Sequence, residues 1–393
     1  MASYSLLVLS LIVLSLPSLS QIDYRQLHQD AIVVDTHNDV VQRIISGEDI
    51  STRTHRGHSD LPRFKEGGVD VQMFSIWVPP ERTARSYFDQ ANEQIDSIES
   101  FVRRSSPLVG FARTADDIEK FVKEGKFVAM LGLEGGHHIL NDLDKLEHLY
   151  RRGVRYMTLT WNNSTVWATS AKDESDTSVK LGHKGLTELG KQVIRKMNEL
   201  GMMVDVSHVG EQTFWDALAT TTKPVIASHS SAYSLCPHFR NLKDEQIKAV
   251  AKNGGVVFIN FNPGFIDSTF DAKRERLTSK YKTRLDSLKA IFSPDSWDYV
   301  VARDSLMHHE LEAIRPPLSR LIDHIDYVTK LVGADHVGLG SDFDGITMTP
   351  LEMDDVTFLP NVTRELQNRG YSVRDIEKIL GENFLRVLRA NSK

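Results

Sequence analysis

The chain has 393 residues, of which 47 are Lys or Arg and 53 are Asp or Glu, so its formal net charge is −6 at pH 7. This balance gives no basic footprint for nucleic acid, so we expect no nucleic-acid partner, and a hydrophobic fraction of 40% is ordinary for a soluble globular protein. The single cysteine, Cys236, excludes an internal disulfide framework and a thiolate zinc cluster, so any metal site has to use histidines and carboxylates.

The beginning of the chain differs in composition from the rest. Residues 6–16 are apolar except for two serines, and residues 18–20 form a small-x-small ending. This pattern is typical of a signal peptide, and the run is shorter than the roughly 20 apolar residues that a membrane span needs. We therefore expect residues 1–20 to be a signal peptide and the protein to be exported, either periplasmic or secreted, with no stable membrane span once the signal is removed. Residues 2–20 contain no Lys or Arg, so an uncleaved N-terminal membrane anchor is the alternative.

Residues 21–393 contain no low-complexity linker, and we expect them to form a single domain. Short apolar runs recur along this part of the chain, and each one is followed by polar residues. Nearly continuous hydrophobicity is typical of strands that are buried on both faces, as in a parallel sheet. The eight runs cover residues 32–39, 69–78, 127–136, 154–163, 202–210, 224–232, 254–262 and 336–345.

Amphipathic segments separate most of these runs and predict helices. They cover residues 81–104, 114–124, 142–152, 185–200, 211–221 and 243–253. Eight strands that alternate with helices predict an α/β fold, a (β/α)8 TIM-type barrel. The charged stretch 263–313 interrupts the alternation and predicts a helical insertion over the barrel mouth, while the residues from Ser372 onward predict C-terminal helices.

The C-terminal ends of the predicted strands carry the residues that are able to do chemistry, and this is the end at which barrels of this kind place their active sites. His37 and Asp39 are two residues apart, so they point to the same side of an extended chain. Each candidate alone has an ordinary structural explanation, but their coincidence at the ends of separately predicted strands indicates a metal centre. The candidates are His37, Asp39, Glu134, His208, His229 and Asp342.

Imidazole and carboxylate ligands without thiolates suit Zn²⁺ or a similar divalent ion. Five protein ligands are too many for one tetrahedral zinc ion but suit two. Glu134 would then bridge the ions, with His37 and Asp39 on one and His208 and His229 on the other. Two such ions hold a bridging hydroxide and polarise a carbonyl group.

Seven stretches of the sequence resemble the membrane dipeptidase (renal dipeptidase-like) family of zinc peptidases. They follow the family order and extend over nearly the whole mature chain. They are DTHNDV (35–40), LEGG (133–136), RYMTLTWNNSTVWA (155–168), DVSHV (205–209), ASHSSA (227–232), FRNL (239–242) and GLGSDFDG (338–345).

The resemblance implies a function and a role for each matching position. The protein would be a metallo-dipeptidase with two Zn²⁺ ions, bridged by Glu134, that hydrolyses the amide bond of dipeptides through the metal-bridging hydroxide. Asp342 resembles the acid–base residue that accepts a proton and passes it to the leaving amine, so Asp342 and Glu134 are the predicted catalytic residues. Arg240 resembles the arginine that receives the free carboxylate of the substrate.

One position departs from the family pattern. Well-known members have a histidine after Leu-Thr that helps to hold the scissile carbonyl oxygen, and this sequence has Trp161 there. Indole donates a hydrogen bond but does not titrate in the physiological range. Trp161, its neighbour Asn162 or a zinc ion would then stabilise that oxygen, so both residues are predicted to bind substrate; a packing role for Trp161 is the alternative.

Two other functions are compatible with the same residues. The first is another binuclear metal hydrolase on this barrel, of the lactonase, phosphotriesterase or deaminase type, although the H-x-D at residues 37–39 and Glu134 favour a peptidase. The second is a catalytically inactive barrel that binds a ligand and lost turnover through Trp161. The resemblance also implies a homodimer.

Overall fold

The computed structural model describes residues 23–80, 85–294 and 296–393. The predicted signal peptide therefore lies outside the described residues. Eight parallel strands form a closed barrel, because β2 and β4, at the two ends of the strand order, also pair with each other. In hydrogen-bonded order the strands are β2 (Val71–Ile76), β1 (Val34–Asn38), β9 (Val337–Leu339), β8 (Val256–Ile259), β7 (Ile226–Ser230), β6 (Met203–Asp205), β5 (Val154–Thr158) and β4 (Phe127–Glu134). Each predicted apolar run contains one of these strands, which confirms the (β/α)8 barrel.

A further strand, β3 (Val109–Phe111), lies outside the barrel. It pairs with the first residues of β4, on the edge that β5 occupies from Leu131 onward. The sequence analysis did not predict β3, because three residues between two helices carry no recognisable apolar pattern.

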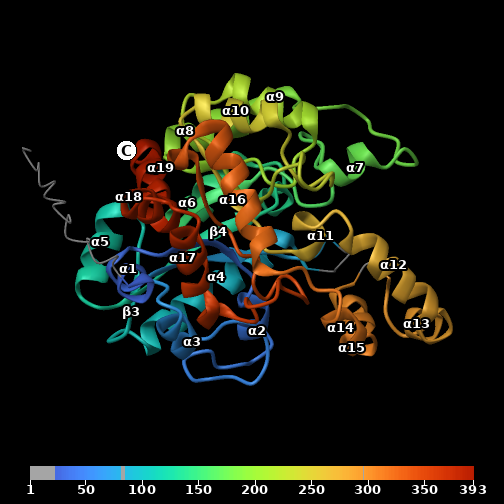
Figure 1. Cartoon of the computed structure of the whole chain (residues 1–393). Helices are drawn as coiled ribbons and strands as arrows, with labels where there is room; N and C mark the ends of the chain where they lie inside the picture. Colours follow the sequence, from blue (N-terminus) through green and yellow to red (C-terminus); the bar gives the residue numbers. More distant parts are fainter. Residues whose placement is uncertain (1–22, 81–84, 295) are drawn as a thin grey trace, which may run out of the picture.

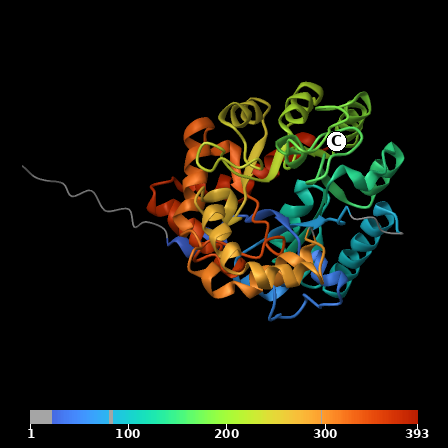
Figure 2. The same ribbon diagram turned by 90° about the vertical axis from the view of Figure 1, so that its right-hand side faces the viewer.

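Helices surround the barrel, as Figures 1 and 2 show. All six predicted amphipathic segments contain a helix, although residues 81–84 of the first lie outside the described residues. The six helices are α4 (Tyr87–Arg104), α5 (Ala115–Lys123), α6 (Leu143–Arg151), α8 (Glu188–Leu200), α9 (Glu211–Thr220) and α10 (Asp244–Lys252). Six further α-helices of the described residues were not predicted individually: α1 (Tyr24–Asp30), α2 (Val41–Ile45), α3 (Leu61–Glu66), α7 (Ala171–Ser175), α16 (Leu318–Val332) and α17 (Pro360–Asn368).

The predicted insertion is helical and follows β8. It contains α11 (Pro263–Ile266), α12 (Phe270–Lys280), α13 (Lys282–Lys289), α14 (Trp297–Leu306) and α15 (His308–Glu312). Figure 1 shows these helices together with α7 at one end of the barrel, while α5, α18 (Val373–Glu377) and α19 (Asn383–Asn391) lie at the other end. Ser372 caps α18 by accepting a hydrogen bond from Asp375 N.

The inside of the barrel is filled by one apolar cluster, to which β2 contributes alternate residues such as Val71 and Met73. The C-terminal helix α19 closes the N-terminal end of the barrel, because Phe384 packs against Phe258 of β8 at a ring distance of 6.2 Å. Near the end of α19, Asn391 donates a hydrogen bond to the carbonyl oxygen of Pro224, just before β7. The floor of the barrel is thus apolar and covered, which leaves polar chemistry to the opposite end.

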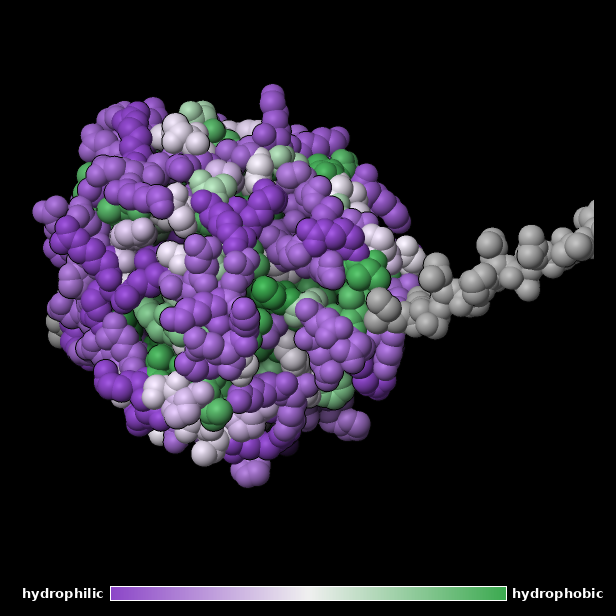
Figure 3. Space-filling view, turned by 90° about the vertical axis from the view of Figure 1, so that its left-hand side faces the viewer, coloured by the Kyte–Doolittle hydropathy of each residue, from purple (hydrophilic) through white to green (hydrophobic). Residues whose placement is uncertain are grey.

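Within residues 23–80, 85–294 and 296–393, no helix is both long enough and apolar enough to span a bilayer. The barrel end that carries α5 and α18 presents a mostly hydrophilic surface with scattered apolar residues (Figure 3).

Candidate metal centre

The six candidate residues, which come from the ends of five strands and the loops that follow them, meet at the C-terminal end of the barrel. Two sets have ligand atoms that all lie within 4.8 Å of one another. One set is His37, Glu134 and His229, and the other is His37, Asp39 and Asp342. His208 joins the first set, because its Nε2 lies 3.0 Å from Oε1 of Glu134. The convergence expected from the strand ends is therefore present.

Three of these residues lie beyond the strand ends: Asp39 comes directly after β1, and His208 and Asp342 lie further along their loops. β6 ends at Asp205 and β9 ends at Leu339, so His208 and Asp342 each follow three residues later. Both have a left-handed backbone, with φ values of 63° and 65°. A left-handed residue breaks the extended conformation, so these strands are shorter than their apolar runs, and the side chains turn back over the barrel mouth.

Glu134 lies at the middle of the cluster and turns its two carboxylate oxygens to different partners. Its Oε2 lies 3.5 Å from Nε2 of His37, which is itself 3.3 Å from Oδ2 of Asp39. Its Oε1 lies 3.0 Å from Nε2 of His208 and 3.6 Å from Nε2 of His229. Ser75 on β2 orients this carboxylate by donating a hydrogen bond to Oε2 at 3.2 Å. One carboxylate thus faces two separate groups of ligand atoms.

Hydrogen bonds on the far side of the rings fix the protonation of His37 and His208. The hydroxyl of Tyr156 donates to the carbonyl oxygen of Thr36 at 3.0 Å, so it accepts the Nδ1 proton of His37, also at 3.0 Å. Nδ1 of His208 lies 3.0 Å from Oδ1 of Asn162 and donates to it. In both rings Nδ1 carries a proton, so Nε2 is the nitrogen that a metal ion would bind. Against the effect of burial, the nearby Tyr156, Asp39 and Glu134 raise the pKa of His37 well above its usual range, so a metal ion would displace a proton from its Nε2.

His229 is oriented in the same way through a longer chain. Its Nδ1 lies 2.8 Å from Oγ of Ser228, which donates its own proton to Oδ2 of Asp205 at 2.6 Å. Ser228 therefore accepts from Nδ1, and Nε2 of His229 also carries a lone pair. The Nε2 atoms of His208 and His229 are only 2.9 Å apart. Two lone pairs at this distance repel each other, and a shared cation relieves that repulsion.

The donor set fits divalent metal ions. A tetrahedral Zn²⁺ site with bonds of about 2.0–2.2 Å separates any two ligands by about 3.4 Å. The separations of His37 from Asp39 and of Glu134 from its histidines, 3.0 to 3.6 Å, fall around this value. Burial lowers the pKa of His208 to about 3 and the pKa of His229 well below its usual range, so both rings are neutral and able to bind a metal ion.

Asp342 lies beside this cluster with a different set of contacts. Its Oδ1 is 4.0 Å from Nε2 of His37, and its Oδ2 accepts a hydrogen bond from Nδ2 of Asn260 at 2.9 Å. Burial, reinforced by the nearby charges of Asp39 and Glu134, raises the pKa of Asp342 to about 7 against an opposing effect of His37. A carboxyl group with this pKa is able to take up and release a proton near neutral pH.

Gly345 permits the close approach of two carboxylates. A Cβ atom at this position would lie 2.2 Å from Oδ2 of Asp39 and 2.6 Å from Oδ1 of Asp342. Any side chain at residue 345 would therefore displace both groups, which explains the glycine in the SDFDG stretch.

Arg240 is buried and lies close to the histidines. Its Nη2 donates to the carbonyl oxygen of His229 at 3.3 Å, and its guanidinium lies over the ring of Phe265. Within the part of the chain that the structure describes, Nη1 of Arg240 is buried without a hydrogen-bond partner. Burial lowers the pKa of Arg240 to about 10, so it keeps its positive charge at neutral pH. A buried, charged and incompletely bonded guanidinium is a site for an anionic group.

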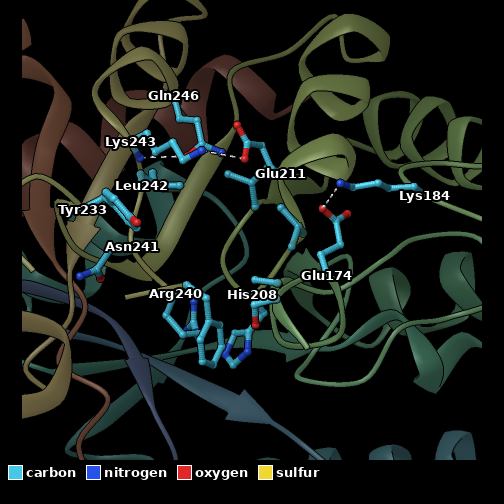
Figure 4. Close-up of a pocket in the computed structure, with 15 residues that line it drawn as sticks. Glu174, Lys184, His208, Glu211, Tyr233, Arg240, Asn241, Leu242, Lys243 and Gln246 are labelled. Atoms are coloured by element: carbon cyan, nitrogen blue, oxygen red, sulfur yellow. Dashed lines mark hydrogen bonds and ion pairs between the residues drawn. The ribbon is translucent and has the colours of Figure 1, made fainter. Parts of the chain in front are cut away.

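A pocket adjoins Arg240 and His208, which lie side by side at its base (Figure 4). Two ion pairs border its other side. Lys243 Nζ lies 2.8 Å from Glu211, and Lys184 Nζ lies 3.8 Å from Glu174. This arrangement gives a charged rim above the arginine and the candidate metal ligand.

Trp161 and Asn162, in the loop after β5, have different surroundings. The ring of Trp161 is tilted over His208 at 6.3 Å and packs against Trp77 at 5.1 Å. Asn162 orients His208 through the hydrogen bond described above. Substrate binding by Trp161 and Asn162 stays a prediction, since these contacts are to other side chains of the site.

Comparison with known proteins assigns the family. The family model described as membrane dipeptidase, peptidase family M19, matches residues 22–393. The chain belongs to this family.

Similar proteins agree with the membrane dipeptidase assignment. A dipeptidase, tcpJ, of Claviceps purpurea (strain 20.1) is 31% identical over 370 residues, which cover 90% of this chain and 76% of that protein. The probable dipeptidase PvdM of Pseudomonas aeruginosa has a similar structure, with a TM-score of 0.77, 28% identity and coverage of 94% and 97%. A metallopeptidase of Rhodobacter sphaeroides, solved with a phosphinate mimic of the dipeptide L-Ala-D-Ala, gives a TM-score of 0.72, 26% identity and coverage of 92% and 100%. As a member of this family, the chain is a metal-dependent peptidase that hydrolyses dipeptides.

Several residues of this membrane dipeptidase site were not predicted from the sequence. Tyr156 was one more apolar residue of a buried run, and Asn260 lay in a run without a candidate. Tyr156 binds His37 across the barrel and Asn260 binds Asp342 beyond the neighbouring strands β8 and β9, at sequence separations of 119 and 82 residues. The role of Asp205 could have been predicted, because a carboxylate inside a buried strand has to be hydrogen-bonded. It accepts hydrogen bonds from the backbone amides of Ser207 and Ser228.

Proposed function

We propose that this dipeptidase acts with two Zn²⁺ ions. His37 and Asp39 would bind one ion, His208 and His229 the other, and Glu134 would bind both. The orientation of Glu134 carries the proposal, since Oε2 faces His37 while Oε1 faces His208 and His229. When bound, such a pair of ions activates a water molecule at neutral pH and polarises the carbonyl group of the substrate.

Substrate binding is proposed to depend on Arg240. Its buried guanidinium, whose Nη1 has no hydrogen-bond partner among the described residues, suits the C-terminal carboxylate of a dipeptide. Because Nη2 of Arg240 donates to the carbonyl oxygen of His229, a carboxylate bound to the guanidinium would lie close to the metal ligands. This short separation favours dipeptides over longer chains. Trp161 and Asn162 would contribute to the wall beside the scissile carbonyl.

Asp342 is proposed to be the acid–base residue. It accepts a proton from the attacking water and returns it to the nitrogen of the leaving amine. Two observations support this role: the hydrogen bond from Asn260, which leaves Oδ1 directed toward His37, and a pKa raised to about 7 by burial. Glu134 completes the predicted catalytic pair by holding the two groups of ligands together.

The alternatives expected from the sequence lose support at this site. A lactonase, phosphotriesterase or deaminase does not require a buried arginine beside the metal ligands to bind a free carboxylate of its substrate, whereas a dipeptidase does. An inactive barrel has no need of a carboxyl group placed for proton transfer, whereas Asp342 is held beside His37 by a hydrogen bond of 2.9 Å from Asn260.

We also propose that the protein is exported and forms a homodimer. The apolar run at residues 6–16 supports export through a signal peptide, with an uncleaved anchor as the alternative. Family membership is the reason to expect a dimer. N-terminal sequencing of the purified protein and its mass in solution test these two points separately.

The decisive experiment measures metal content together with cleavage of a mixed library of L,L and L,D dipeptides. We expect two zinc ions per chain, loss of cleavage on chelation and recovery when Zn²⁺ is added back. One ion per chain would contradict the bridging role of Glu134. Full occupancy without cleavage of any dipeptide would instead favour the inactive-barrel alternative.

A further inference from the structure

Asp342 belongs to a segment whose backbone is held in an unusual conformation. Asp342 and Asp344 both have left-handed φ values, 65° and 62°. Such values cost free energy in residues with a side chain, and they persist only where the surroundings hold them. The position of the Asp342 carboxylate therefore depends on the groups that hold residues 342–345.

One side of the segment is held by β1. The amide of Asp342 donates to the carbonyl oxygen of His37 at 3.1 Å, and the amide of Asp39 donates to the carbonyl oxygen of Phe343 at 2.9 Å. These two bonds fix the position of residues 342–343 relative to the candidate metal ligands His37 and Asp39, but neither bond involves Asp344.

The other side is held by His58 through a reciprocal pair of hydrogen bonds. The amide of His58 donates to Oδ1 of Asp344 at 2.9 Å, and the amide of Asp344 donates to Nδ1 of His58 at 3.0 Å. The Asp344 side chain is only 2% exposed. Gly57 allows this approach, since a Cβ atom there would lie 2.1 Å from Oδ1 of Asp344.

Arg43 anchors this pair. Its Nη1 donates to Oδ1 of Asp344 at 3.2 Å and to the carbonyl oxygen of Ser59 at 2.8 Å. Its Nε and Nη2 bind the two carboxylate oxygens of Glu48 at 2.9 and 3.1 Å, and Nη2 also donates to Thr54 at 2.6 Å. All five donors of the guanidinium are thus used, and one planar group joins Asp344 to the loop of residues 48–59.

We propose that Arg43 is a positioning residue for the acid–base step, and that it acts through Asp344 on the carboxylate of Asp342. The proposal rests on the role proposed above for Asp342. Arg43 touches neither the metal ligands nor the pocket beside Arg240, so its contribution is to turnover and not to binding of metal or substrate. Displacement of a catalytic group by about 1 Å is enough to lower a rate up to about 100-fold.

The test compares Arg43→Gln and Arg43→Lys with Arg315→Gln. Arg315 is a matched control, because it is also nearly buried, binds Glu312 and Asp354, and donates to the backbone of Thr349 and Pro350 further along the same loop. For Arg43→Gln we expect kcat to fall about 10- to 100-fold, with KM within about twofold and unchanged zinc content. Arg43→Lys should recover part of kcat, whereas Arg315→Gln should lower Tm and keep kcat.

Equal kcat values for Arg43→Gln and wild type would overturn the proposal. So would a loss of kcat that comes with a loss of zinc, because Arg43 would then support the fold of the metal site in general. If Arg43→Gln does not fold, the Arg43→Lys variant decides in the same way. If Asp342→Asn retains full kcat, the acid–base role itself fails; if only Arg43→Gln retains it, the positioning role alone fails.

Discussion

Oδ1 of Asn162 lies 3.0 Å from Nδ1 of His208 and decides which nitrogen of that ring faces the candidate metal centre. Substitution Asn162→Ala removes this acceptor and frees the ring to rotate or to change tautomer. We expect the affinity for metal to fall about 10- to 100-fold, as is usual for lost partners of ligating histidines. Competition with a chelator, followed by metal analysis, measures the change. Asn163→Ala on the same loop is the control. Equal metal affinities of the two variants would show that Asn162 does not contribute to metal binding.

Gly345→Ala should disturb the centre without a change of charge. The added Cβ would lie 2.2 Å from Asp39 and 2.6 Å from Asp342, closer than carbon and oxygen approach in proteins. We expect reduced zinc occupancy and a large loss of kcat in a protein that still folds. Gly182→Ala is the matched control, because a Cβ there meets no atom within 4 Å. A Gly345→Ala enzyme with wild-type zinc and kcat would contradict the close approach.

Asp342→Asn keeps the size of the side chain and its bond to Asn260 but removes proton transfer. We expect kcat to fall about 10²- to 10⁴-fold while both metal ions remain bound. Steady-state kinetics and metal analysis on the same sample check the two halves of this prediction. An unchanged kcat would exclude Asp342 from the reaction, and loss of zinc would make it a ligand instead.

Arg240→Lys should weaken recognition of the substrate carboxylate. Lysine replaces the planar fork with a single ammonium group, so paired hydrogen bonds to a carboxylate are lost. We expect kcat/KM for free dipeptides to fall about 10²-fold, while kcat/KM for dipeptides with an amidated C-terminus changes little. The measurement is the ratio of kcat/KM for the free dipeptide to kcat/KM for its C-terminal amide. A parallel loss on both would indicate a structural role for Arg240.

His324 on α16 predicts a pH dependence of stability. Its Nδ1 accepts a hydrogen bond from the amide of Ala232, and its Nε2 donates to the carbonyl oxygen of Ile266. Burial lowers the pKa of His324 from 6.5 to about 4. Between these values the unfolded chain binds more protons than the folded chain, so the free energy of unfolding falls as pH decreases from 6.5 to 4. The loss from this group is on the order of 3 kcal/mol.

Chemical denaturation between pH 4.5 and 7 tests the contribution of His324. The His324→Asn variant should show a flatter dependence of unfolding free energy on pH than the wild type. Substitution of the exposed His309 by Gln should leave the slope unchanged. Parallel slopes for wild type and His324→Asn would show that His324 is not responsible.

The fold was predictable because buried parallel strands leave a strong local signal. All eight barrel strands lie within apolar runs, and the polar residues that end those runs meet at one rim. The positions at which the strands end were harder to predict, since the left-handed backbone of His208 and Asp342 depends on contacts that the sequence does not reveal. β3 was missed because its pairing with β4, not its own composition, makes it a strand.

The metal-binding residues were predictable from the sequence, but the residues that orient them were not. Tyr156 reaches His37 across the barrel, and its place in a hydrophobic run concealed that contact. Arg43 and Asp344 are 301 positions apart, and only the folded chain brings them together. Neither Tyr156 nor Arg43 is a distinctive residue type at its position in the sequence, so neither contact could be predicted.

Helix α19 seals the floor of the barrel, and Asn391 near its end is bound to the backbone just before β7, at the opposite end from Glu134. An immobilisation tag added after Lys393 would therefore extend from the end of the barrel opposite the candidate metal ligands. Molecules tethered to a support in this way would present the reactive end to the passing solution.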